Sequence, residues 1–114
     1  LIVDDEDMVR RVLERILVRS GQKVTAVSGG REAIETLRKD DFDMVITDLG
    51  MPGVSGFDVA HYVKEHRPAL PVILVTGWGA TVTPEQMQDA GAVGMIAKPF
   101  RHEQLVAVLG EHLH

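Results

Sequence analysis

Residues that could bind a metal ion or a phosphate stand directly after short apolar runs of the chain. Asp4 and Asp5 follow the first such run, and Asp48, Thr76 and Lys98 each close a later one. Carboxylates are ligands that hard divalent cations such as Mg²⁺ prefer, and an ammonium or a hydroxyl can bind a phosphate oxygen. These groups suit phosphoryl transfer, in which a carboxylate can itself be the nucleophile and become an aspartyl phosphate.

Each of these residues taken alone also has an ordinary structural explanation. The pair Asp4-Asp5 could be the acidic first turn of a helix, where carboxylates complement the helix dipole. Asp48 and Thr76 both precede glycine-containing turns, and Lys98 could be a solvated surface lysine. Because all of them fall at the ends of apolar runs, the joint pattern favours a functional site.

The apolar runs predict strands, and the segments between them predict helices. The runs are short and rich in β-branched residues, as strands buried on both faces of a sheet are. Intervening segments carry apolar residues at helical spacing, which indicates helices. Strand then helix, repeated five times, predicts an α/β fold in which helices cover both faces of a parallel sheet. The predicted strands are Leu1–Val3, Val24–Val27, Met44–Thr47, Val72–Val75 and Gly94–Ala97.

This topology gives the strand-end residues a common location. In open parallel sheets the ligand site lies outside the carboxyl ends of the strands. We therefore expect three carboxylates, one hydroxyl and one ammonium to converge on one edge; they belong to Asp4, Asp5, Asp48, Thr76 and Lys98. Three local signals mark helix boundaries: Gly21 as a stop, Ser28 as a possible cap, and Thr83-Pro84 as a cap followed by a first-turn proline.

Composition limits the other possibilities. The 114 residues fit one domain, which we assign to residues 1–114, and we expect the first strand to lack some N-terminal residues. The chain has no cysteine, so disulfides and thiolate metal sites are excluded. A net charge of −5 without a basic cluster argues against duplex nucleic acid as a partner. No apolar stretch approaches the roughly 20 residues of a membrane span.

Four stretches of the chain resemble the receiver domain of two-component response regulators. They are Leu1-Ile-Val-Asp-Asp-Glu6, Asp48-Leu-Gly-Met-Pro-Gly-Val-Ser-Gly56, Val75-Thr-Gly77 and Lys98-Pro-Phe100. The resemblance covers essentially the whole chain. It implies a doubly wound, five-stranded, flavodoxin-like (βα)5 fold with strand order 2-1-3-4-5, acting as a cytoplasmic phosphoacceptor domain and not as an enzyme.

The resemblance also implies a role for each site residue. Asp48 would accept the phosphoryl group. Asp5, Asp48 and the main-chain carbonyl of Gly50 would bind Mg²⁺, or Mn²⁺, directly, and Asp4 would act mainly through a bound water. The phosphoryl donor would be a phosphohistidine on a sensor histidine kinase or a histidine phosphotransfer domain.

The resemblance further implies how the signal leaves the site. Lys98 would pair with the phosphoryl group, and Thr76 would hydrogen-bond to it and move inward. The altered face would comprise the fourth helix, fifth strand and fifth helix, roughly residues 83–111, through which a homodimer could form.

Two positions depart from the family pattern. Met95 stands where a switch aromatic is usual, so a rotamer switch there would be blurred or replaced. Gly50 has no side chain beside the acceptor, and Trp78 could supply bulk from the other side. We therefore predict that Gly50 and Trp78 help to set the lifetime of the phosphoaspartate.

Other assignments remain open from the sequence. A pseudo-receiver would keep the fold without phosphorylation, and only Met95 favours it. A haloacid-dehalogenase-like phosphatase would need a second aspartate at position 50, where this chain has glycine. The motifs around Asp48 and Thr76 also resemble receivers attached to sensor kinases, which suggests a hybrid kinase as one possible source.

Overall fold

The computed structural model describes residues 1–51, 53–77, 82–98 and 100–112. Strands and helices alternate along this part of the chain, as the apolar pattern predicts. None of the helices in the described ranges is both long and apolar enough to cross a membrane. The elements are β1 Ile2–Val3, α1 Asp7–Arg19, β2 Ala26–Val27, α2 Gly30–Lys39, β3 Val45–Asp48, α3 Gly56–His66, β4 Val72–Thr76, α4 Pro84–Ala90, β5 Gly94–Ala97 and α5 His102–His112.

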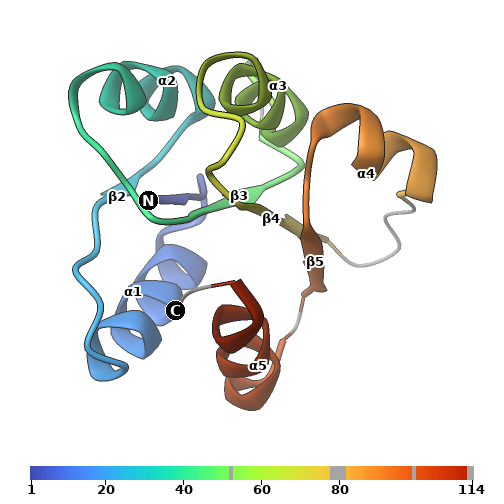
Figure 1. Ribbon diagram of the computed structural model, residues 1–114. Coiled ribbons are helices and arrows are strands. Elements are labelled where there is room, and N and C mark those ends of the chain that lie inside the picture. The colour runs from blue at the N-terminus through green and yellow to red at the C-terminus, as the bar shows by residue number, and fades with distance from the viewer. Residues whose placement is uncertain (52, 78–81, 99, 113–114) are drawn as a thin grey trace.

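The five strands form one parallel sheet in the order β2-β1-β3-β4-β5. Both the parallel arrangement and the expected strand order are therefore confirmed. Helices α1 and α5 lie on one side of the sheet, and α2 and α3 lie on the other (Figure 1). From β1 the chain adds β2 on one side of the sheet and then β3, β4 and β5 on the other. The order of strand addition therefore reverses between β1 and β3, which places a topological switch point between their carboxyl ends.

Alternation along the strands divides the core into two layers. On β4, Val72 and Leu74 pack in the cluster that contains residues of α2 and α3, whereas Ile73 and Val75 pack in the cluster that contains residues of α1 and α5. All four side chains are buried, as strands covered on both faces require. The strand ends that carry the polar residues are thereby held from both sides of the sheet.

Two of the predicted helix boundaries are confirmed. Gly21 follows the end of α1 with a φ of +86°, a conformation that glycine adopts readily. At α4 the Thr83 hydroxyl accepts the main-chain N–H of Gln86, and the Gln86 side chain accepts the N–H of Thr83. This reciprocal capping box, with Pro84 in the first turn, explains why so short an apolar signal still yields a helix.

The third predicted boundary is wrong. The N-cap of α2 is Gly29, and no side chain caps this helix end. The Ser28 hydroxyl instead lies 3.2 Å from the carboxylate oxygens of Glu32 and donates to that side chain. A serine near a helix start caps only from the N-cap position, and here the helix begins one residue later than the sequence suggests.

Helix α3 begins against the main chain of the acceptor strand. A Cβ atom on Gly56, its first residue, would lie 2.3 Å from the main-chain oxygen of Asp48 and 2.8 Å from Cα of Leu49. No larger residue fits without moving one of these backbones. The N-terminus of α3 is further fixed by a capping box between Ser55 and Asp58. The end of β3 and the start of α3 are therefore held as one unit.

We expect Gly56→Ala to lower the free energy of unfolding by about 1–3 kcal/mol, because the added methyl group forces the backbones apart. Gly110→Ala is the matched control. Gly110 lies in α5, and a Cβ there would have no neighbouring atom within 4 Å. The control should raise the free energy of unfolding by up to about 1 kcal/mol through helix propensity. Urea unfolding followed by circular dichroism measures both. Equal stability of the two variants would contradict the close contact.

Candidate acidic site

The polar residues at the strand ends converge on one edge of the sheet, as predicted. Asp4 directly follows β1, Asp48 and Thr76 are the last residues of β3 and β4, and Lys98 directly follows β5. In the parallel register Asp48 pairs with Val75, one residue before Thr76. The main-chain N–H of Lys98 donates to the main-chain oxygen of Thr76 at 2.8 Å. The ends of β3, β4 and β5 therefore share one edge.

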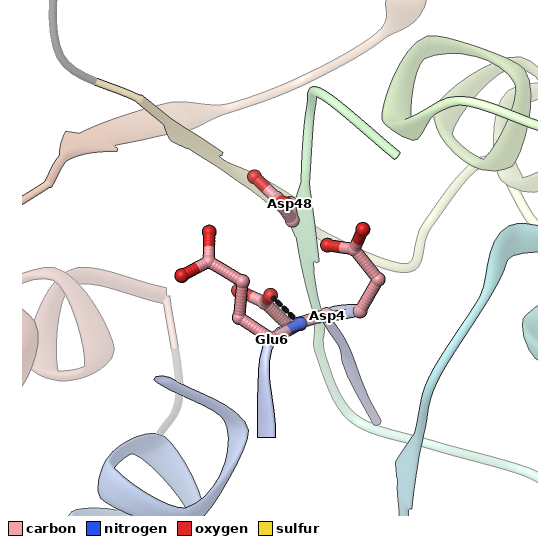
Figure 2. A group of neighbouring side chains, drawn as sticks. Asp4, Glu6 and Asp48 are labelled. Atoms are coloured by element: carbon pink, nitrogen blue, oxygen red, sulfur yellow. Dashed lines mark hydrogen bonds between the residues drawn. The ribbon is translucent and has the colours of Figure 1, made fainter. Parts of the chain in front are cut away.

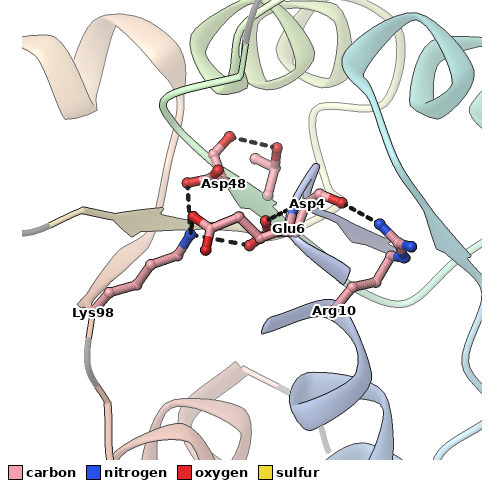
Figure 3. A network of polar contacts seen from close by, with 6 residues as sticks. Asp4, Glu6, Arg10, Asp48 and Lys98 are labelled. Carbon is pink, nitrogen blue, oxygen red and sulfur yellow. Dashed lines mark hydrogen bonds and ion pairs between the residues drawn. The ribbon is translucent and has the colours of Figure 1, made fainter. Parts of the chain in front are cut away.

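The ammonium of Lys98 is the point at which the acidic side chains meet. Its Nζ lies 3.3 Å from Oδ2 of Asp4 and 3.4 Å from Oδ1 of Asp48. A third carboxylate, that of Glu6, lies 3.2 Å from the same Nζ. Figure 3 shows the lysine reaching from the end of β5 toward these acids. One cation thus faces three anions.

Asp4 is held rigidly although it carries the most buried charge of the site. Its side chain is fully buried, its Oδ1 accepts the N–H of Glu6 at 2.8 Å, and its main-chain oxygen accepts the Arg10 guanidinium at 2.8 Å. Its Oδ2 is buried and has no aligned hydrogen-bond donor, since Lys98 reaches it only as an ion pair. This oxygen is left incompletely satisfied.

Burial dominates the protonation behaviour of Asp4. Loss of water around the carboxylate raises its pKa, and the neighbouring Asp48 carboxylate raises it further. The N–H of Glu6 and the ammonium of Lys98 act in the opposite direction but do not compensate. The ionised form of Asp4 therefore destabilises the folded protein when no other cation is present.

The opposite balance holds for Lys98. Burial lowers the pKa of this ammonium, but the carboxylates of Asp4, Glu6 and Asp48 together outweigh burial and raise it. Lys98 is therefore charged at neutral pH and contributes stability that is lost only as the pH rises through its elevated pKa.

The side chains at this edge fit a hard divalent cation. Asp4, Asp5, Glu6 and Asp48 each offer a carboxylate oxygen, and these atoms all lie within 4.8 Å of one another. Figure 2 shows Asp4, Glu6 and Asp48 directed toward one region. Four carboxylates against one ammonium leave an excess of negative charge, and Oδ2 of Asp4 lacks a hydrogen-bond donor. Oxygen ligands in this number and charge are what Mg²⁺ binds.

Gly50 lies two residues after Asp48 and carries no side chain. Gly50 is exposed, and a Cβ atom there would have no neighbour within 4 Å. Gly53 has a φ of +75°, which accounts for the glycine at this turn. Trp78, the other residue predicted to influence the site, lies outside the described residues. The open space at Gly50 is available to a reactant or to solvent.

Met95, the residue at the expected switch position, is exposed. It lies within β5 opposite Leu74, and 41% of its surface is exposed. Its neighbour Ile96 is buried in the core layer of α1 and α5, so Met95 points away from that layer. The residue at the expected switch position is thus an outward-facing methionine.

Glu6 and Arg10 both contact the site, although no sequence motif assigned a role to either. Glu6 reaches Lys98, and Arg10 holds the main chain at Asp4 while its other nitrogen pairs with Asp7. The only sequence signal for Glu6 was its position after two strand-end acids, and it followed a pattern equally typical of an acidic helix start.

The fold and this site define the class of protein. It is a flavodoxin-like, doubly wound α/β domain in which a cluster of carboxylates and a lysine lie together at the topological switch point. The model of the response regulator receiver domain family matches residues 1–110, so the chain belongs to that family.

Known relatives agree with this assignment. The chain is 36% identical over 110 residues to the response regulator protein PilR of Pseudomonas aeruginosa, covering 94% of this chain and 25% of PilR. It is 33% identical over 118 residues to the sensory/regulatory protein RpfC of Xanthomonas campestris, covering 97% of this chain and 16% of RpfC. The chain thus spans a quarter or less of the length of these two relatives.

A solved structure shows the same architecture. The response regulator protein TrrA from Thermotoga maritima, in complex with Mg²⁺-BeF, superposes with a TM-score of 0.90 at 27% identity. The match covers 98% of this chain and 96% of that chain.

We expect Asp4→Asn to raise the free energy of unfolding of the metal-free protein at pH 7 by about 1 kcal/mol, because it removes a buried, poorly compensated charge. The folded-state pKa of Asp4 is raised, so the gain should vanish below the ordinary carboxyl pKa of about 3.9 and grow as the pH rises above it. The difference in free energy of unfolding between the two proteins is measured by urea unfolding in EDTA at pH values from about 3 to about 8, which bracket the ordinary carboxyl pKa.

Glu35→Gln is the control, since Glu35 is exposed on α2 and is not among the carboxylates that contact Lys98. It should leave the free energy of unfolding nearly unchanged at every pH. A neutral or destabilising effect of Asp4→Asn at pH 7 would contradict the conclusion that burial dominates at this carboxylate.

Proposed function

We propose that this receiver domain accepts a phosphoryl group on Asp48 as a step of a phosphorelay. The observation that carries the proposal is the position of Lys98, whose Nζ lies 3.4 Å from Oδ1 of Asp48. A cation at that distance can stabilise the charge of a phosphoryl group bound to the same carboxylate. Gly50, two residues after Asp48, has no side chain, and a Cβ there would meet no described atom within 4 Å, which would favour access of a donor.

The proposed reaction forms one bond and breaks one. An oxygen of Asp48 attacks the phosphorus of a phosphohistidine, and a new O–P bond forms. The P–N bond breaks, and its electron pair returns to the imidazole nitrogen of the donor, which then takes up a proton. The product is an acyl phosphate that carries more negative charge than the original carboxylate, and Lys98 is the cation beside it.

Mg²⁺, or Mn²⁺, is the cofactor that we propose for this reaction. Asp5, Asp48 and the main-chain carbonyl of Gly50 would hold the ion, and Asp4 would contribute through a water. When bound, such an ion neutralises the carboxylates and the phosphoryl oxygens. Support comes from the cluster of four carboxylates and from TrrA, a relative whose structure contains Mg²⁺-BeF.

The readout that we propose is a shift of the face formed by α4, β5 and α5. Thr76 would hydrogen-bond to the phosphoryl group, and its main-chain oxygen already accepts the N–H of Lys98. Val93, Met95 and Val106 are partly exposed apolar side chains in this region and could support a homodimer.

The partner that we propose is a sensor histidine kinase or a histidine phosphotransfer domain, and the expected location is the cytoplasm. The chain is similar both to a response regulator, PilR, and to a sensory/regulatory protein, RpfC. Either a separate regulator or a hybrid kinase is therefore consistent with these relatives. A haloacid-dehalogenase-like phosphatase is disfavoured, because Gly50 offers no second acid.

We expect wild-type protein incubated with acetyl phosphate and Mg²⁺ to gain the mass of one phosphoryl group, as read by intact mass spectrometry. Asp48→Asn should abolish the adduct, because the nucleophilic oxygen is lost. Asp89→Asn should leave the adduct unchanged, since this exposed acid lies on α4. No adduct on the wild-type protein, or an adduct that survives Asp48→Asn, would contradict the proposal. The first outcome would favour a pseudo-receiver.

We expect Gly50→Leu to lengthen the half-life of the phosphoaspartate several-fold, because a bulky apolar side chain would fill the open space through which water reaches the acyl phosphate. The half-life is measured by loss of the phosphoryl mass after removal of acetyl phosphate. Gly110→Ala, in α5, is the control and should leave the half-life unchanged. An unaltered half-life in Gly50→Leu would show that the space beside Asp48 does not govern hydrolysis.

A further inference from the structure

Glu6 differs from the other two acids that contact Lys98 in how it is held. Oε1 of Glu6 accepts a hydrogen bond from Nζ of Lys98 at 3.2 Å, although 62% of the Glu6 side chain is exposed. The side chain of Lys98 is itself only 15% exposed. The contact therefore joins a largely solvated carboxylate to a largely buried ammonium.

The other two carboxylates cannot move away from Lys98 at low cost. Asp4 is fully buried, and two hydrogen bonds hold its side chain and its main chain. Asp48 is the last residue of β3 and is also buried. Glu6, in contrast, is the N-cap residue of α1, and its side chain makes no capping hydrogen bond. Water can solvate the Glu6 carboxylate as soon as it leaves the lysine.

Three carboxylates already surround the ammonium of Lys98. Asp4, Glu6 and Asp48 each place an oxygen within 3.4 Å of Nζ, and the hydrogen bond from Nζ goes to Glu6. A phosphoryl group on Asp48 brings additional oxygens and additional negative charge to the same place. These oxygens would compete with the present partners for the ammonium, and the exposed Glu6, which holds the hydrogen bond from Nζ, loses least by giving way.

We propose that Glu6 takes the place of the phosphoryl group in the unmodified protein. Its carboxylate holds Lys98 there, and the phosphoryl group displaces it from Lys98 on modification. This inference rests on the proposed function and adds a residue to it. Glu6 is a positioning residue, because it acts on the acceptor through Lys98. Its carboxylate competes with the phosphoryl oxygens for the lysine and so weakens the binding of a phosphoryl-like anion.

The first test measures the binding of beryllofluoride, a phosphoryl analogue, to the full chain at saturating Mg²⁺. We expect Glu6→Gln to tighten binding about two- to fivefold, the range that corresponds to the worth of a partly exposed ion pair. The Kd for Mg²⁺ alone, measured by calorimetry, should change less than this. A loss of Mg²⁺ affinity without tighter beryllofluoride binding would overturn the proposal and identify Glu6 as a metal ligand.

Asp7→Asn is the matched control for the removal of one negative charge near the site. Asp7 is exposed and adjacent to Glu6, but it pairs with Arg10 and not with Lys98. It should leave the Kd for beryllofluoride unchanged. Equal tightening in both variants would overturn the proposal, because the effect would then come from net charge and not from the contact with Lys98.

The second test does not depend on phosphorylation. In metal-free, unmodified protein, the rate at which a limiting amine reagent labels Lys98 is followed by peptide mapping. Glu6→Gln should raise this rate about two- to fivefold, because the ammonium loses one partner, whereas labelling of Lys64 should not change. An unchanged rate at Lys98 would overturn the proposal. If the rate rises but wild type never accepts a phosphoryl group, the proposed function fails while the contact stands.

Discussion

The sharing of one ammonium among three carboxylates is the interaction on which the site depends. Lys98 and Glu6 are separated by 92 positions in the chain, and they meet only because the fold brings β5 and β1 to one sheet edge. The long, flexible stem of lysine allows Nζ to reach carboxylates that follow two other strands. Without this cation, the buried Asp4 and Asp48 would face each other with no opposite charge among the contacts described here.

The site carries a cost in stability that the rest of the fold must offset. Asp4 is buried with a raised pKa, and one of its carboxylate oxygens has no hydrogen-bond partner, so its ionised form is costly in the folded protein. Two covered faces of the sheet supply the compensating apolar burial. Such a balance is typical of functional sites, where groups are placed for a ligand and not for the stability of the free protein. Under the proposed function, a divalent cation held by these carboxylates would offset this cost.

Topology was predictable from the sequence, whereas side-chain direction was not. The apolar runs place Asp48 and Thr76 at strand ends, and the parallel sheet then fixes their common edge. Glu6 lies beyond the end of β1, where no periodicity determines where its carboxylate points. Its contact with Lys98 arises from tertiary placement alone. Ser28 failed as a predicted cap for a related reason, since capping depends on one exact backbone position that residue type does not determine.

Lys98 contacts two buried carboxylates and one exposed carboxylate, and this difference bears on how a signal could leave the site. Asp4 and Asp48 are buried, so Glu6 is the acid among the partners of Lys98 that can leave at low cost. Position 95 carries an outward-facing methionine and not an inward aromatic. The remaining connection is the main chain, where the N–H of Lys98 is bonded to the oxygen of Thr76 at 2.8 Å. Under the proposed function, a change in the partners of Lys98 would act directly on the ends of β4 and β5. On that proposal the signal would not depend on a rotamer switch at position 95, because Lys98 belongs to the site and also directly follows β5.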